Sequence, residues 1–160
     1  MLADAIRSET YRLSRNRTAL FWSVLFVPIM GVLLATVGFV VAKANEAKLV
    51  GKLPPELMKG GPLDLGLALV KSAGDFANPA ILMFVLIGAA TLYAGDYRWE
   101  TWRLISARNT RSNLIAGKVV VAVLVIVLAT LAALASDVIA GLIQAAVFGR
   151  PLAFSMTGGA

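Results

Sequence analysis

Long apolar runs, separated by segments rich in basic residues, dominate this 160-residue chain. Each of three runs, Thr18–Ala42, Phe76–Gly95 and Val119–Phe148, is 20 residues long or longer. The hydrocarbon core of a bilayer is ~30 Å thick, and about 20 helical residues cross it. Because lipid offers the backbone no hydrogen-bond partner, such runs form helices. The spacing therefore predicts three membrane-spanning helices, at about 18–42, 76–95 and 119–148.

Composition agrees with a membrane protein. Hydrophobic residues make up 59% of the chain, and the mean hydropathy is +0.81. A soluble domain of this length would have too little polar chain to cover three fully apolar helices. We therefore predict an all-α integral membrane protein with one transmembrane domain, residues 1–160, and no separate soluble domain. Its spans are joined by a loop at 43–75 and a second loop at 96–118.

The first apolar run also resembles a secretory signal, because arginines precede it and Ala42-Lys43-Ala44 imitates a cleavage site. The apolar region of a signal peptide is usually 7–15 residues long, however. This run has 25 residues. Its length favours a signal anchor that stays in the membrane.

The segment before the first run, residues 2–17, places Leu2, Ile6 and Leu13 near one helical face and arginines around the rest. This distribution predicts an amphipathic helix that lies in the membrane interface. The alternative is an ordinary basic flank without a fixed helix. We favour the interfacial helix.

Basic residues orient the chain, because lysines and arginines accumulate in cytoplasmic loops. The N-terminal 17 residues contain four arginines, and residues 96–118 contain five basic side chains. Residues 43–75 also contain five, all lysines, but these are spread over 33 positions. The higher density predicts that the N-terminus and the 96–118 loop are cytoplasmic, in the cell inner membrane, and that 43–75 is the outer loop.

The chain lacks the residues of several chemistries. It has no cysteine and no histidine, and no glycine-rich phosphate loop ending in Gly-Lys-Ser/Thr. We therefore predict no catalytic residue, no metal site and no cofactor site, and ATP used in its function would be bound by another polypeptide. The excess of basic residues is explained by attraction to anionic lipid, so membrane lipid is an expected partner and nucleic acid is not.

The outer loop contains a candidate helix of its own. Leu63, Leu67 and Val70 repeat at helical spacing after the turn signal Gly60-Gly61-Pro62. A short amphipathic helix here would rest on the outer surface or cap a pathway.

Aromatic and basic residues alternate in the 96–118 loop. Trp99, Trp102, Arg103 and Ile105 fit a short helix at the membrane interface. Such a helix, held between two spans, is suited to pass a push from a soluble partner to the membrane. A basic, lipid-facing loop anchored by tryptophans has the same composition, and the pattern alone leaves the two interpretations even.

The same loop resembles the cytoplasmic loop of ABC-2 type exporter permeases, the membrane-spanning subunits of ABC transporters. In that family an acidic residue is followed by Gly-Thr, a basic residue, a Leu-Leu-Ser-like turn, an arginine and a lysine that opens the next helix. The corresponding residues here are Asp96, Thr101, Arg103, Leu104-Ile105-Ser106, Arg111 and Lys118. Glu100 stands where glycine is usual, and the proline expected near Arg108-Asn109 is missing.

The resemblance implies a function. Residues 96–118 would dock a separate ATP-binding-cassette ATPase, with these candidate contact residues: Asp96, Trp99, Glu100, Thr101, Arg103, Arg111 and Lys118. The chain would be the N-terminal half of a six-span permease and would form the substrate path with a second permease copy or half. The alternative is a small three-span accessory or anchoring subunit without transport activity.

Asp137 is the one charged side chain within the apolar runs. It lies ~27 Å along a helix that begins near Val119, close to the outer side of the hydrocarbon core. A carboxyl group at this depth must face protein or water, or be protonated. It is therefore a candidate for lining a substrate path, and the alternative is a structural contact with interfacial water or a neighbouring helix.

Overall fold

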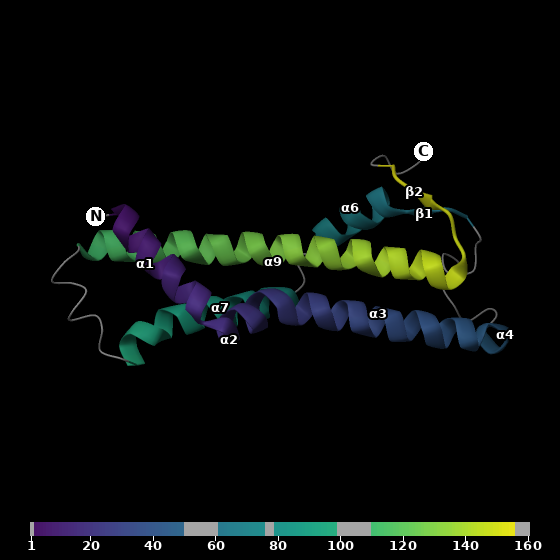
Figure 1. Cartoon of the computed structure of the whole chain (residues 1–160), viewed down its shortest axis with the longest axis horizontal. Coiled ribbons are helices and arrows are strands. Elements are labelled where there is room, and N and C mark those ends of the chain that lie inside the picture. Colours follow the sequence, from purple (N-terminus) through teal and green to yellow (C-terminus); the bar gives the residue numbers. More distant parts are fainter. Residues whose placement is uncertain (1, 50–60, 76–78, 99–109, 156–160) are drawn as a thin grey trace. The chain divides into compact units, whose positions relative to one another are not determined.

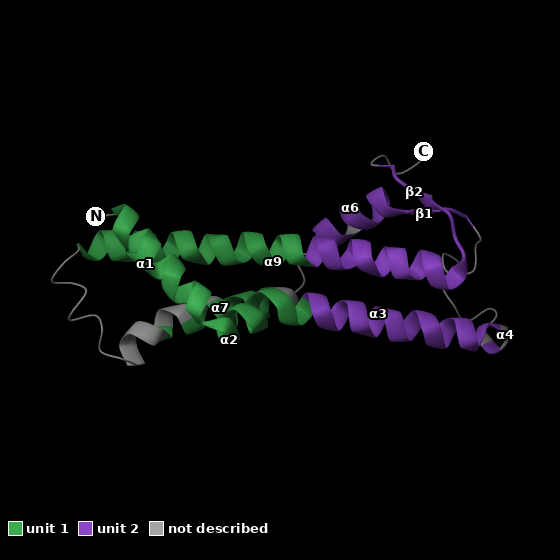
Figure 2. Cartoon of the chain, in the orientation of Figure 1, with its two compact units in different colours: residues 1–27, 77–132 green, residues 28–76, 133–160 purple. Residues whose placement is uncertain are grey.

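The computed structural model of the chain describes residues 2–49, 61–75, 79–98 and 110–155. These residues are mostly helical, and the elements follow one another in the order shown in Figure 1. They form two compact units (Figure 2). Unit 1 comprises residues 1–27 and 77–132, and unit 2 comprises residues 28–76 and 133–160.

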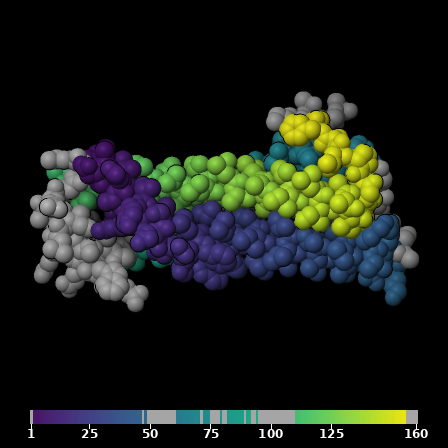
Figure 3. Space-filling view, in the orientation of Figure 1, coloured from purple at the N-terminus to yellow at the C-terminus, as the bar shows by residue number. Residues whose placement is uncertain are grey.

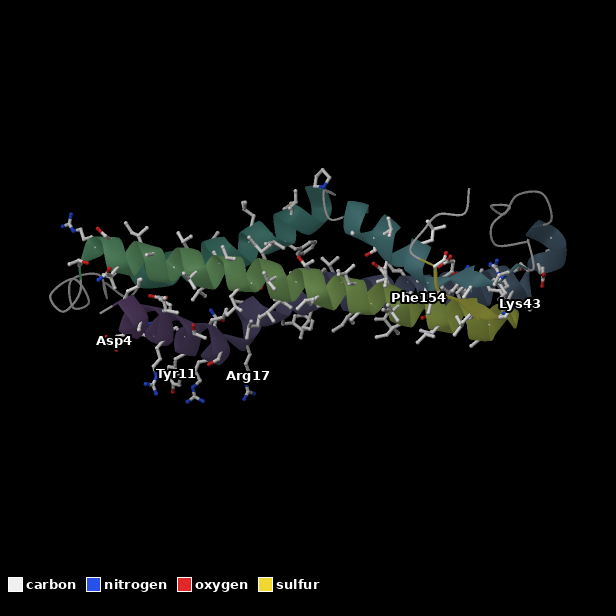
Figure 4. All side chains as sticks on the ribbon, turned by 90° about the horizontal axis from the view of Figure 1, so that it is seen from above. Asp4, Tyr11, Arg17, Lys43 and Phe154 are labelled. Carbon is white, nitrogen blue, oxygen red and sulfur yellow. The ribbon has the colours of Figure 1, made fainter. Side chains whose placement is uncertain are left out.

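Unit 1 begins with the amphipathic helix α1, Leu2–Arg15, which agrees with the helix expected at 2–17. Its buried face differs from the expected one. Leu13, of the expected apolar face, is buried, but Leu2 is 44% exposed, and the other buried residues are Ala5 and Glu9. The small Ala5 lets α1 approach another helix more closely than Leu2 would. Tyr11 points away from α9 (Figure 4).

Asn16 separates α1 from the first long apolar helix. Its side-chain Oδ1 accepts a hydrogen bond from the backbone N–H of Ala19 at 3.1 Å, which caps α2, Arg17–Leu20. Asparagine is a favoured residue at this position because it satisfies an N–H that the helix leaves unpaired. The cap therefore fixes the point at which the chain changes direction.

The first apolar helix continues without a break from Arg17 to Ala44. It consists of α2, a π-helical turn η1, Phe21–Leu25, and α3, Phe26–Ala44. The buried Ser23 hydroxyl donates to the carbonyl of Ala19 at 2.6 Å within this stretch. Side-chain hydrogen bonds to the preceding turn often accompany local irregularity in helices.

Helix α7, Pro79–Arg98, packs on η1 within unit 1. Gly88 faces Ser23 so closely that a Cβ at Gly88 would overlap the serine side chain. The rings of Phe26 and Phe84 pack beside this contact, with centroids 5.1 Å apart. Small residues thus allow two apolar helices to approach closely, as is common in membrane proteins.

Helix α9, Arg111–Phe148, is the longest described element at 38 residues, or about 57 Å at the α-helical rise. It begins before Val119, where the apolar run starts, so residues 111–118 are helical rather than part of a loop. In unit 1 its Val121, Val125 and Ala129 form a core with Leu13 and Val24. Figure 3 shows α1 lying directly against the beginning of α9.

Unit 2 contains a short strand pair that an all-α prediction omits. Strand β1, Leu63–Asp64, runs parallel to β2, Leu152–Ala153, with Leu63 opposite Leu152. The helix expected after the glycine turn is present as α6, Leu65–Asp75, and the short helix α4, Glu46–Leu49, follows α3 near the start of the segment 43–75. Gly149, with φ of 64°, ends α9 and turns the chain towards β2.

Two of the described helices are long and apolar enough to cross a membrane. Arg17–Ala44 has a window of mean hydropathy 2.6, and Arg111–Phe148 has one of 2.9. Of these windows, 6% and 17% of the residues are buried. A core helix of a soluble protein hides most of its surface, whereas these helices expose theirs, as lipid contact requires.

Candidate functional site

The residues predicted to dock an ATPase are divided by the structure. Asp96 lies in the last turn of α7, and Arg111 is the exposed first residue of α9. Lys118 lies two turns further along α9. The remaining candidates fall outside the described residues: Trp99, Glu100, Thr101 and Arg103.

Lys118 is held in an ionic cluster with α1. Its Nζ lies 3.8 Å from Oε1 of Glu9, and Arg12 Nη1 donates to the same oxygen at 3.4 Å. The side chains of Lys118 and Glu9 are 8% and 7% exposed, whereas that of Arg12 is 39% exposed. We call these three residues the ionic clamp. It places one carboxylate between two cations.

Close helix contact brings the clamp together. A Cβ at Gly117 would lie 3.3 Å from the backbone carbon of Ala5, so α1 and α9 cross with a glycine against an alanine. Glu9 is one turn beyond Ala5, and Lys118 follows Gly117 directly. The crossing therefore determines that these two side chains meet.

Burial gives the clamp its energetic importance. A charge taken out of water is costly unless an opposite charge and hydrogen bonds replace the lost hydration. If one of the buried partners were removed, the other would keep its desolvation cost without the compensating attraction. The pair therefore couples the position of α1 to that of the first turns of α9.

Sequence reasoning did not identify Glu9. A signal was present, because Ile6, Glu9 and Leu13 are spaced by three and four residues and so share one face of α1. An acidic residue between two apolar ones on the buried face of a helix indicates a cationic partner on the helix it packs against. The identity of that partner depended on the crossing with α9.

In unit 2, Asp137 of α9 contacts a neighbouring helix. The hydroxyl of the buried Ser72, on α6, donates a hydrogen bond to Asp137 Oδ2. Both side chains also line a hollow of about 240 Å³, together with Gln144 and with apolar residues from α3, β1, α6 and α9. Asp137 therefore makes a contact with a neighbouring helix, as the structural interpretation expects, and it also lines a hollow.

Asp64 connects the start of α6 to the segment after α9 through hydrogen bonds. Its Oδ1 accepts from the backbone N–H of Leu67 at 3.1 Å and from that of Ser155 at 2.9 Å, and its Oδ2 accepts from the Ser155 hydroxyl. These bonds to the ionised form, those from Ser155 first, lower the pKa of Asp64 to about 2. The guanidinium of Arg150 adds a bond to the carbonyl of Gly61 at 2.8 Å.

Comparison of the chain with family models, with curated proteins and with solved structures finds no match.

Proposed function

We propose that the chain is an integral membrane protein with three spans: α2 to α3, α7 and α9. In this proposal the N-terminus and residues 96–118 are in the cytoplasm, and α4, the strand pair and α6 are outside. The membrane is the cell inner membrane. The exposed apolar surfaces of the two long helices support membrane insertion. The density of basic residues supports the orientation.

We further propose that the protein is the permease subunit of an ATP-binding-cassette exporter. A separate ATPase would dock on residues 96–118, and two permease copies or halves would enclose the substrate path. The resemblance of the loop to ABC-2 permeases supports this function. Catalysis of ATP hydrolysis would belong to the partner.

The observation that carries the proposal is the ionic clamp. Docking on residues 96–118 moves the start of α9, and the buried Glu9–Lys118 pair passes that movement to α1. Asn16 joins α1 directly to the first apolar helix. A movement of residues 96–118 would therefore be passed on to two spans. Coupling of this kind lets ATP binding shift the balance between inward- and outward-facing arrangements.

Charge reversal at an exposed end of α9 tests the docking. Arg111→Glu places a negative charge at the end of the loop, and Lys48→Glu makes the same change on α4, on the side proposed to be outside. We expect the affinity-tagged chain, purified from its native membrane, to bring with it an ATP-binding-cassette subunit identified by mass spectrometry. Arg111→Glu should lower the recovered ATPase at least fivefold, and Lys48→Glu should leave it unchanged.

Two outcomes would overturn the proposed permease function. Equal recovery of the ATPase with both variants would exclude docking through this end of α9. Recovery of the unaltered chain in a stable complex with an unrelated membrane enzyme, and without an ATPase, would support the accessory or anchoring subunit instead.

A further inference from the structure

The hollow in unit 2 has an apolar wall and a polar wall. Phe39 of α3, Leu63 of β1 and Ala68 of α6 form part of the apolar wall. Ser72, Asp137 and Gln144 form the polar wall, and Asp137 carries the charge among them. An apolar space with a few convergent polar groups is the usual form of a small-molecule site.

The carboxylate of Asp137 favours a cationic occupant. The Ser72 hydroxyl occupies one of about four positions at which a carboxylate accepts a hydrogen bond. A hydroxyl orients the negative charge but does not neutralise it. An ionised group within an apolar helix is stabilised by an opposite charge, and a ligand in the hollow is placed to supply one.

Aromatic rings reinforce that preference. Phe39 lines the hollow, and its ring centroid lies 6.3 Å from that of Phe148 in an edge-on arrangement. The ammonium of Lys43 lies over the Phe148 ring at 5.7 Å, and Glu46 compensates its charge at 2.9 Å. Beside the hollow, unit 2 therefore holds the cationic side chain of Lys43 against an aromatic face, which is an attractive arrangement for a cation.

The size of the hollow favours an organic cation over a metal ion. At the packing density of protein interiors, about 240 Å³ holds on the order of ten non-hydrogen atoms. A metal ion with ligands at about 2.0–2.6 Å would fill only a fraction of that space. An amine or ammonium group bonded to an apolar body would occupy both walls at once.

We propose that this hollow binds a monovalent organic cation, an amine or quaternary ammonium with an apolar body of about ten non-hydrogen atoms. The cationic group lies against Asp137 and Phe39, and the body lies against Leu63 and Ala68. The inference rests on the proposed exporter function and names the class of its substrate.

Equilibrium binding to the purified full chain in detergent micelles tests the site. The probe is tritiated benzyltrimethylammonium, measured by scintillation proximity. Neopentylbenzene is its uncharged isostere and serves as a competitor. We expect saturable binding of the cation and at least tenfold weaker competition by the isostere, because the isostere lacks the charge that Asp137 attracts.

Variants distinguish binding in the hollow from partition of the probe into the detergent micelle. Asp137→Asn keeps the shape and still accepts from Ser72, and we expect it to weaken binding of the cation at least tenfold. Glu46→Gln removes an exposed carboxylate from the same unit and should leave binding within twofold. Ala140→Leu extends a side chain into the hollow and should also weaken binding at least tenfold.

Unchanged affinity in Asp137→Asn or in Ala140→Leu, with helical content preserved by circular dichroism, would overturn the proposal. Equal competition by the isostere would do the same. The assay contains no ATPase, so its failure leaves the docking result intact. Conversely, specific binding of the cation together with failure to recover an ATPase would reject the exporter and keep the site.

Discussion

The two units each have a carboxylate at a helix contact, and they use it differently. In unit 1, Glu9 meets the ammonium of Lys118 and the guanidinium of Arg12, so its charge is compensated within the protein. In unit 2, Asp137 accepts from the hydroxyl of Ser72, and it borders a hollow. The first carboxylate joins helices, whereas the second keeps a charge that a ligand can use.

The helix contacts differ in the same direction. Unit 1 brings backbones together through Gly117 against Ala5 and Gly88 against Ser23. In unit 2, Gly66 of α6 lies against the backbone of Ser155, but Gly141, on the part of α9 that borders the hollow, faces the end of the Leu65 side chain. Backbone contacts leave no room for adjustment, whereas a leucine side chain can move. The comparison teaches that the α1–α9 crossing of unit 1 suits the transmission of movement, whereas the helix contact beside the hollow of unit 2 can adjust to a molecule.

The largest expected effect is a difference in labelling from the two sides of the membrane, between a residue of unit 1 and a residue of unit 2. The chain has no cysteine, so single-cysteine variants can be labelled without background. Ser112→Cys, in the first turn of α9, and Ala73→Cys, on α6, both replace exposed residues. We expect a membrane-impermeant maleimide to label Ala73→Cys in intact cells and Ser112→Cys only after the membrane is opened. Labelling of Ser112→Cys from outside would invert the proposed orientation.

Removal of the clamp's carboxylate should cost more than removal of an exposed one. Glu9→Gln removes the carboxylate beside the buried ammonium of Lys118, and we expect a loss of about 3 kcal/mol in the free energy of unfolding. Glu46→Gln breaks the Lys43–Glu46 pair, whose side chains are 48% and 52% exposed, and should cost at most about 0.5 kcal/mol. Titration with sodium dodecyl sulfate measures both.

A double variant checks the cause of that loss. Lys118→Met combined with Glu9→Gln removes both buried charges and should recover most of the stability, because no buried charge of the pair then remains. Trypsin cleavage within α1 reports whether this helix detaches locally. We expect the cleavage rate to rise in the single variant Glu9→Gln and not in the double variant. Similar losses in Glu9→Gln and Glu46→Gln would remove the distinction between a buried and an exposed pair.

The apolar runs located the helices well. The apolar runs at 18–42, 76–95 and 119–148 all fall largely within described helices, because length and hydropathy are properties of the sequence alone. The helices of the first and third runs are long and apolar enough to cross a membrane, and the span at 76–95 stays a prediction. The start of α9 was harder to predict from the sequence. Residues 111–118 are polar enough for a loop, and yet they are helical, with Leu114 buried and Lys118 paired with Glu9 of α1. The partner of Lys118 lies in a distant segment, which the local pattern of residues 111–118 does not reveal.

The candidate site could be predicted only in part, for the same reason. Asp137 was identifiable, because a charge in an apolar run is conspicuous. Its partner Ser72 is 65 residues away, in a helix whose hydroxyl has no distinctive sequence context. Glu9 was overlooked because its importance depends on Gly117, which admits α1 close to α9. Pairing between helices is not encoded in the periodicity of either helix.

The smallest expected effect distinguishes the two kinds of helix contact. Gly88→Ala places a Cβ on the Ser23 side chain and 3.4 Å from its Cα, so a backbone must shift, at a cost of about 1–2 kcal/mol. In Gly141→Ala the Cβ lies 2.8 Å from the mobile Cδ2 of Leu65, and the helical preference of alanine offsets the adjustment to within about 0.5 kcal/mol. Gly38→Ala, with nothing within 4 Å, should gain up to about 1 kcal/mol and sets the reference. The same detergent titration measures all three, and equal losses at Gly88 and Gly141 would mean that unit 2 is packed as rigidly as unit 1.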